Sequence, residues 1–170
     1  MSSFIKNYIK EKYRYNEEQI YFLCGGDKAY KSITINKHNG QTRLIRVPCK
    51  ELMKVQREVL EILKKKIKDT KYLKHQYAYR KGKNNIEYAR VHLHRKYLFK
   101  YDLKNYFDQI TFPRIIGTLT KNNIYEDDAI FIAQLSCYRI NNKHIALAQG
   151  GPLSPFLLFR HNIFLCLSFF

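Results

Sequence analysis

Tyr97-Leu-Phe-Lys-Tyr-Asp102-Leu-Lys-Asn-Tyr-Phe107 is the stretch that decides the predicted fold, together with Gln149-Gly-Gly-Pro-Leu-Ser-Pro155. The first stretch is rich in β-forming residues and predicts a short strand that ends on a single carboxylate, Asp102. An aromatic side chain, Phe107, follows five residues later. The second stretch predicts a loop that opens a helix, and its glycines let the backbone come close to a ligand because they lack a β-carbon.

The segments that precede the first stretch predict helices and one β-hairpin. Residues 3–23 predict one or two helices, with a helix start at Asn16. Residues 30–47 predict a hairpin that turns at Asn39-Gly40, because alternating residues flank this turn signal. Residues 51–68 repeat apolar side chains at helical spacing and predict an amphipathic helix.

Residues 84–92 predict a further helix, and residues 96–101 predict the strand that ends at Asp102. His92 and His94 are two residues apart, which would point both rings the same way on a strand. A polar surface pair is favoured over a metal site, because no Cys or carboxylate stands at a suitable spacing.

The C-terminal half predicts helices and a short β-segment. Helices are predicted from Thr111, over residues 126–138 and from Ser154, with a tight turn and a short strand over residues 139–148. Asp127 and Asp128 lie in the first turn of the second of these helices, where the helix dipole favours negative charge. No repeat or low-complexity linker interrupts the chain, so we expect an α+β fold in one continuous domain.

Composition indicates a polyanionic partner. The 170 residues include 31 Lys and Arg against 14 Asp and Glu, a formal net charge of +17. Such an excess favours nucleic acid before membrane, and Tyr beside Lys and Arg is typical of surfaces that stack bases and hold phosphates. A general Lys, Ile, Asn and Tyr bias of the source proteome is the alternative cause of this charge.

The cysteines and the chain ends exclude several classes of protein. The four cysteines form no C-x-x-C pair, so neither a zinc site nor a disulfide framework is predicted, and a cytoplasmic location fits reduced thiols. The N-terminus lacks the apolar run of a signal peptide. Residues 155–170 are apolar but too short and too interrupted by polar side chains to span a membrane.

The candidate site gathers one carboxylate, aromatic rings and cations. A lone Asp at a strand end is usually a turn residue. The case for a functional role of Asp102 therefore comes from the residues around it. Tyr106 and Phe107 place a ring where an incoming sugar could be screened. Cations that could lie over a triphosphate are Arg43, Arg46, Arg80 and Lys83.

Four motifs in order resemble those of bacterial reverse transcriptases of the retron and phage-defence type, with group II intron reverse transcriptases next. Residues 30–56 resemble the fingers hairpin and its following helix, and Tyr79-Arg-Lys-Gly-Lys-Asn84 resembles the basic turn. Residues 102–110 resemble motif A, and residues 149–155 resemble motif B. The resemblance implies the fingers and partial palm of a right-hand polymerase. It divides the chain into an N-terminal helical segment (1–28), a fingers-like region (29–95) and a partial palm (96–170).

The same resemblance implies roles for individual residues. Asp102 would be catalytic and would bind Mg2+ together with the Leu103 carbonyl. Phe107 would exclude a 2′-hydroxyl. Nucleotide contacts would come from Arg43, Phe107, Gln149 and Gly150, and nucleic-acid contacts from Arg46, Arg80, Lys81 and Lys83. The partners would be an RNA template, a DNA or RNA primer and dNTP.

The sequence departs from this family after motif B, where the thumb and the primer grip are also missing. No Tyr-x-Asp-Asp segment of the kind that supplies the remaining metal ligands is present, and a two-metal site needs more carboxylate than Asp102 supplies. We therefore expect an RNA-directed DNA polymerase fragment, truncated before that motif and inactive alone, with a second chain as a candidate source of the missing part. The alternative is an RNA-binding remnant or subunit without catalysis.

Overall fold

The computed structural model describes residues 3–36, 40–68, 77–78, 82–99, 103, 105–141 and 144–167. The described residues form helices and two separate two-stranded sheets, which is the expected α+β arrangement. The elements are α1 (Phe4–Tyr13), α2 (Glu17–Cys24), the 3-10 helix η1 (Gly26–Ala29), β1 (Tyr30–Asn36), β2 (Thr42–Pro48), α3 (Lys50–Lys66), α4 (Asn85–Arg90), α5 (Tyr106–Gln109), α6 (Phe112–Lys121), α7 (Glu126–Ser136), β3 (Cys137–Asn141), β4 (His144–Leu147) and α8 (Ser154–Leu167).

Side-chain caps set the boundaries of the first two helices. The Ser3 hydroxyl accepts a hydrogen bond from the Lys6 backbone N–H, and α1 ends at Arg14 in the left-handed conformation (φ 52°). Asn16 and Gln19 form a reciprocal capping box at the start of α2. The helix start predicted at Asn16 is therefore confirmed.

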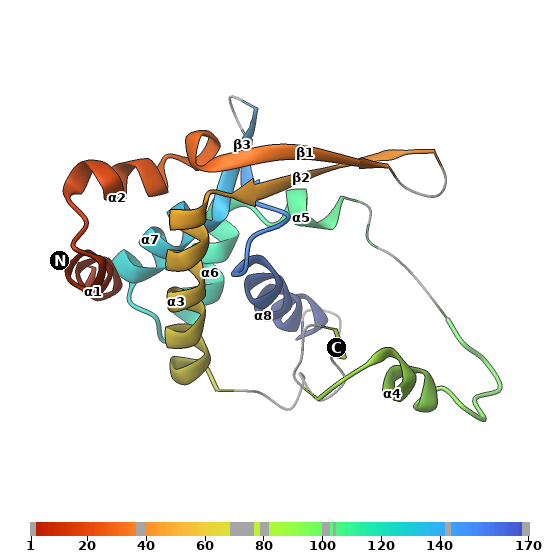
Figure 1. Ribbon diagram of the computed structural model, residues 1–170. Coiled ribbons are helices and arrows are strands. Elements are labelled where there is room, and N and C mark those ends of the chain that lie inside the picture. The colour runs from red at the N-terminus through yellow and green to blue at the C-terminus, as the bar shows by residue number, and fades with distance from the viewer. Residues whose placement is uncertain are drawn as a thin grey trace.

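The predicted β-hairpin is present and extends away from the helices (Figure 1). β1 and β2 pair antiparallel from Tyr30 opposite Pro48 to Asn36 opposite Thr42. Asn39, which belongs to the predicted turn, lies outside the described residues. Most hairpin side chains are exposed, and burial begins only where the hairpin reaches the helices, at Tyr30 and Pro48.

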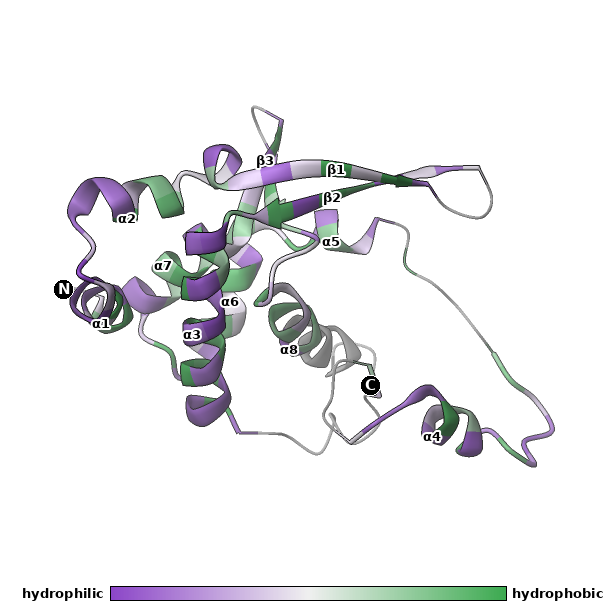
Figure 2. Cartoon of the chain, in the orientation of Figure 1, coloured by the Kyte–Doolittle hydropathy of each residue, from purple (hydrophilic) through white to green (hydrophobic). Residues whose placement is uncertain are grey.

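Helix α3 packs one side against the core, in contact with α7. Its apolar stripe is fully buried, as its periodicity predicts, at Leu52, Val55, Val59 and Leu63. The helix ends at Lys66, two residues before the predicted end, because Ile67 turns to an extended conformation. Figure 2 shows α3 with a largely hydrophilic side toward the viewer and the more hydrophobic α7 beside it.

Three predictions about local structure are wrong. His92 and His94 lie in a turn after α4, and His94 has a left-handed backbone (φ 63°), so they do not share a strand. Residues 96–99, the described part of the predicted strand, are not a strand either. A strand needs a hydrogen-bonded neighbour. The two sheets seen in the described part of the chain are β1-β2 and β3-β4, and neither extends to these residues.

The third correction concerns the end of α7. The helix predicted to reach Tyr138 ends at Ser136, and Cys137 begins β3, which pairs with β4. Pairing with β4 outweighs the helical tendency because it satisfies the backbone groups of both segments. The one-turn helix α5 was not predicted, since four residues carry no periodic signal.

A buried carboxylate joins the first helix to the core. Asp128 is 1% exposed, and its Oδ1 accepts hydrogen bonds from the Ser3 hydroxyl (2.7 Å) and the Ile5 backbone N–H (2.8 Å). It also lies in the first turn of α7, as predicted. One side chain therefore places negative charge at the N-termini of two helices, where the helix dipoles favour it.

We predict that Asp128→Ala lowers the free energy of unfolding by about 2–4 kcal/mol, because two charge-assisted hydrogen bonds are removed from the core. Urea unfolding measures this change. Glu126→Ala is the matched control in the same helical turn, and it should change stability by less than about 0.5 kcal/mol because Glu126 is exposed. Equal losses of stability in the two variants would contradict the assigned role of Asp128.

Candidate nucleotide and nucleic-acid site

The structure describes part of the predicted site. Asp102, Arg80 and Lys81 lie outside the described residues. Leu103 is described and half-exposed. The remaining predicted residues lie on four segments: Arg43 and Arg46 on β2, Lys83 before α4, Phe107 on α5, and Gln149 and Gly150 in the loop before α8.

Strand β2 and the loop before α8 are joined by two hydrogen bonds. The Arg43 Nε donates to the Gln149 side-chain carbonyl (2.8 Å), and the Arg46 backbone N–H donates to the Gln149 backbone carbonyl (2.8 Å). Both bonds connect residues that lie far apart in the sequence. The structure therefore brings Arg43, Arg46 and Gln149 together.

Close packing explains both glycines of this loop. Gly150 has φ +132°, and a β-carbon there would lie 2.7 Å from both the Arg46 carbonyl oxygen and the Ile45 Cγ2. At Gly151 a β-carbon would lie 2.6 Å from the Gln56 Oε1. Both distances are far below a normal carbon contact. A residue with a side chain at either position would push the loop away from β2 and α3.

Gln56 is a site residue whose importance the sequence analysis missed. It is completely buried, and its Nε2 donates to the Tyr30 hydroxyl (2.7 Å) and to the Leu135 backbone carbonyl (2.6 Å). The Tyr30 hydroxyl donates to the same carbonyl (2.8 Å), and burial raises the pKa of Tyr30. The sequence feature that could have revealed Gln56 is a polar residue inside the apolar stripe of α3, directly after Val55.

The start of α8 is anchored to the same region. The Ser154 hydroxyl donates to the Ala148 carbonyl (2.5 Å), and the Ala148 backbone N–H donates to the Ser136 carbonyl (2.9 Å). The loop is thus held at both ends, by β2 on one side and by the end of α7 on the other. These hydrogen bonds position the backbone of the loop.

A second network holds α5, which carries Phe107. The Tyr138 hydroxyl donates to Asp108 Oδ1 (3.2 Å), and a His144 ring nitrogen is 2.7 Å from the Asp108 backbone oxygen. The Arg46 guanidinium lies over the Tyr138 ring, 4.7 Å from its centroid, and also binds the Ser32 hydroxyl. Burial, and then the Asp108 charge, raise the pKa of Tyr138. Arg46 therefore links the loop contact to the element that carries Phe107.

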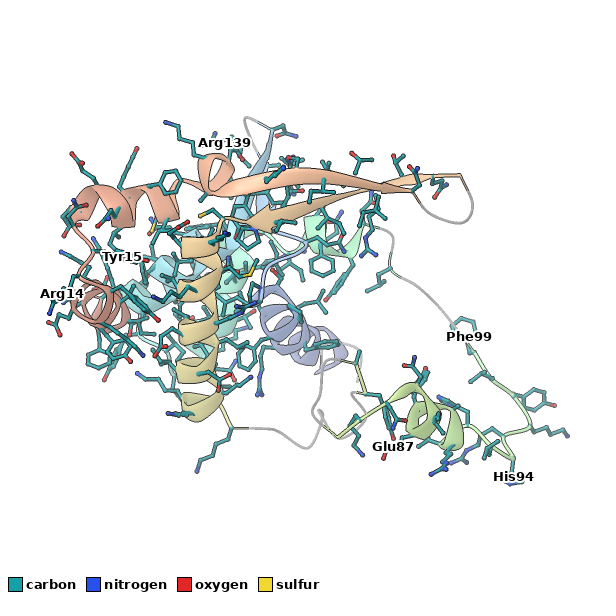
Figure 3. All side chains as sticks on the ribbon, viewed as in Figure 1. Arg14, Tyr15, Glu87, His94, Phe99 and Arg139 are labelled. Carbon is teal, nitrogen blue, oxygen red and sulfur yellow. The ribbon has the colours of Figure 1, made fainter. Side chains whose placement is uncertain are left out.

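Lys83 does not join this cluster. Its ammonium is 3.5 Å from a Glu87 carboxylate oxygen and 5.4 Å from the Tyr77 ring centroid. Figure 3 shows Glu87 on α4, well separated from the hairpin and from the loop before α8. Among the described cations of the predicted site, only Arg43 and Arg46 lie together.

The described residues do not supply a magnesium site. No group of three or more His, Cys, Asp or Glu side chains comes together within the part of the chain that is described. The carboxylate nearest in sequence to Asp102, Asp108, is bound to Tyr138. Magnesium takes carboxylate and phosphate oxygens in octahedral geometry, and this set of donors does not fit that requirement.

Comparison with known proteins decides the family. Residues 35–162 match the reverse transcriptase (RNA-dependent DNA polymerase) family, which is more than half of the chain. The chain belongs to this family. The predicted resemblance to retron-type bacterial reverse transcriptases is confirmed.

Two curated relatives are retron reverse transcriptases. The chain is 30% identical over 133 residues to the retron Ec83 reverse transcriptase of Escherichia coli, which covers 75% of this chain and 42% of that protein. It is also 30% identical over 139 residues to the retron Mx162 reverse transcriptase of Myxococcus xanthus, covering 74% of this chain and 28% of that protein. The matched part is thus less than half the length of either relative. No helix among the described residues is long and apolar enough to cross a membrane.

We predict that Gly151→Ala lowers the unfolding free energy by about 1–3 kcal/mol, because its β-carbon would overlap the buried Gln56. The matched control is Gly117→Ala in α6, where a β-carbon meets nothing within 4 Å and should stabilise the helix by about 0.5–1 kcal/mol. In a double-mutant cycle, Gln56→Ala should reduce the cost of Gly151→Ala. Strict additivity of the two changes would contradict this contact.

Proposed function

We propose that this chain provides the nucleotide-binding and template-binding parts of an RNA-directed DNA polymerase. The observation that carries the proposal is the assembly of Arg43, Gln149 and Gly150, held at the junction of β2 and the loop before α8. The proposal is supported because this junction joins two of the motifs on which the family resemblance rests.

In this proposal Arg43 meets the triphosphate, and its hydrogen bond to Gln149 orients the guanidinium. Gly150 lets the backbone approach the base pair, because no β-carbon separates them. Phe107 lies under the sugar and favours deoxynucleotides by excluding a 2′-hydroxyl. This role of Phe107 is supported by the network through Asp108 and Tyr138, which holds α5.

Asp102 is the proposed catalytic and magnesium-binding residue, with the Leu103 carbonyl. Magnesium, when bound, would stabilise the attacking and leaving oxygens of an in-line displacement at the α-phosphate. The proposed partners are an RNA template, a primer and dNTP, with a second chain as a source of further carboxylate. A cytoplasmic location and a role in phage defence belong to the same proposal.

A non-catalytic RNA-binding role is the second candidate. The observation that favours it is the shortage of grouped carboxylates in the described residues together with a net charge of +17. The two candidate functions predict different results for polymerisation and the same result for RNA binding.

We predict weak RNA binding with a steep dependence on salt, because phosphate contacts release counterions. Changing Arg43, Arg46, Arg80, Lys81 and Lys83 to Gln should reduce the slope of log K against log[salt] by about 0.7 for each phosphate that the variant no longer neutralises. The matched control removes five exposed charges from α3: Lys50, Lys54, Lys64, Lys65 and Lys66. Fluorescence anisotropy with a labelled RNA measures both. An equal fall in the two variants would mean that the binding depends on total charge alone.

We predict no dNTP incorporation by the 170-residue chain alone on a primed RNA with magnesium or manganese. Activity should return when a second polypeptide supplies the Tyr-x-Asp-Asp segment and the thumb. The restored activity should vanish in Asp102→Ala, and Phe107→Ala should admit ribonucleotides. Primer extension by the chain alone would overturn the prediction of inactivity. Failure of the second polypeptide to restore any extension would favour the non-catalytic role.

A further inference from the structure

Arg46 uses its backbone and its side chain on two different parts of the structure. Its backbone N–H donates to the Gln149 carbonyl (2.8 Å), and its carbonyl oxygen lies so close to Gly150 that a β-carbon there would be 2.7 Å away. Its guanidinium lies over the Tyr138 ring, 4.7 Å from the ring centroid. Arg46 therefore contacts the loop before α8 with its main chain and β3 with its side chain.

The Arg46 guanidinium is poorly placed to bind a phosphate. The side chain is partly buried, whereas Arg43, three residues earlier on β2, is exposed. A terminal nitrogen of Arg46 donates to the hydroxyl of Ser32, which lies opposite it in the hairpin, and its buried Nε has no hydrogen-bond partner among the described residues. The side-on fork of a guanidinium includes Nε. Burial of that atom therefore closes one of the two bidentate contacts with phosphate, and the Ser32 bond competes with the other.

The helix α5, which carries Phe107, depends on bonds to other elements for its position. It spans four residues, and a single helical turn is unstable by itself because one hydrogen bond fixes several backbone angles. The Tyr138 hydroxyl donates to Asp108 Oδ1 (3.2 Å), and a His144 ring nitrogen is 2.7 Å from the Asp108 backbone oxygen. Tyr138 and His144 belong to the β3-β4 sheet, so this sheet sets the position of α5.

These contacts form a continuous path from the loop before α8 to Phe107. The Gln149 carbonyl binds the Arg46 backbone, and the Arg46 guanidinium covers the Tyr138 ring. The Tyr138 hydroxyl binds Asp108, the residue that follows Phe107. Phe107 is partly buried and packs against the core, so a displacement of α5 also displaces its ring.

We propose that Arg46 is a positioning residue for the sugar side of the nucleotide site. By stacking on Tyr138 it holds α5, and Phe107 with it, at a fixed place relative to the loop before α8. It makes no contact with RNA phosphate, in contrast to the role that the family resemblance implies for it. The assignment of Phe107 to the sugar rests on the proposed function, whereas the hold of Arg46 on α5 does not.

Hydrogen exchange of the full 170-residue chain, followed by NMR, tests the hold on α5. The reporters are the Asp108 and Ile110 amides, which donate to carbonyl oxygens of this turn (3.1 Å each), and the Ala129 amide of α7 is the reference. Arg46→Gln and Arg46→Lys should both raise exchange at the reporters by about fivefold relative to the reference, because neither side chain restores the planar stacking. Tyr138→Phe should raise it by about tenfold, since it removes a hydrogen bond to a carboxylate.

Two control variants separate local loosening of α5 from other effects. Tyr30→Phe removes a buried hydroxyl that binds the Leu135 carbonyl, and it should not speed exchange at the reporters more than at the reference. Arg43→Gln removes the same charge from the same strand but leaves the contact with Tyr138 in place. It should leave exchange at the reporters unchanged.

RNA binding distinguishes a positioning role from a phosphate contact. A positioning role predicts that Arg46→Gln leaves the slope of log K against log[salt] unchanged. A phosphate contact predicts a slope smaller by about 0.7 in Arg46→Gln and restored in Arg46→Lys, because lysine keeps the charge. Fluorescence anisotropy with a labelled RNA measures the slope in each variant.

Sugar selectivity is measured in the polymerase reconstituted with the second polypeptide. Arg46→Lys should lower the ratio of kcat/KM for dNTP to that for rNTP by about fivefold, the same factor as in hydrogen exchange, because a loosened Phe107 excludes the 2′-hydroxyl less well. Unchanged exchange at α5, an unchanged ratio despite faster exchange, or the salt slopes of a phosphate contact would each overturn the inference. If the unaltered chain extends no primer, the proposed function fails, and the exchange rates decide whether Arg46 positions α5.

Discussion

The packing of the Gly150-Gly151 backbone against β2 and Gln56 is the constraint on which the candidate site depends. At the two positions a β-carbon would come within 2.7 Å and 2.6 Å of neighbouring atoms, so the loop reaches its place only because side chains are absent. This approach lets the Arg46 backbone and the Arg43 side chain bind Gln149. The loop before α8 and the β1-β2 hairpin are therefore joined directly through Gln149.

Polar side chains make the other long-range connections. Gln56 and Tyr30 converge on the Leu135 carbonyl, which ties α3 and β1 to the end of α7. Asp128 ties α7 to α1, and Asp108 holds the Tyr138 hydroxyl. Buried polar groups are costly without partners, so each one selects a single arrangement of the elements that it joins. Asp128 is buried and Asp108 is partly buried, and both carboxylates join elements that lie far apart in the sequence.

The sequence by itself determined most of the helices, the β1-β2 hairpin and the family. The capping residue Asn16, the period of α3 and the hairpin alternation act between neighbouring residues, so these features could be predicted without knowledge of the fold. The family followed from the order of four motifs. Part of the site could also be predicted, because Gln149 and Gly150 belong to one of those motifs.

Only the tertiary structure decided which of these residues meet. The pairing of Arg43 with Gln149, the burial of Gln56 and the shared use of Asp128 by two helices depend on contacts between residues far apart in sequence. The strand expected over residues 96–101 is absent from its described part, and α7 gives way early to β3, for the same reason. A strand exists only where a neighbour satisfies its backbone hydrogen bonds, and local sequence does not specify that neighbour.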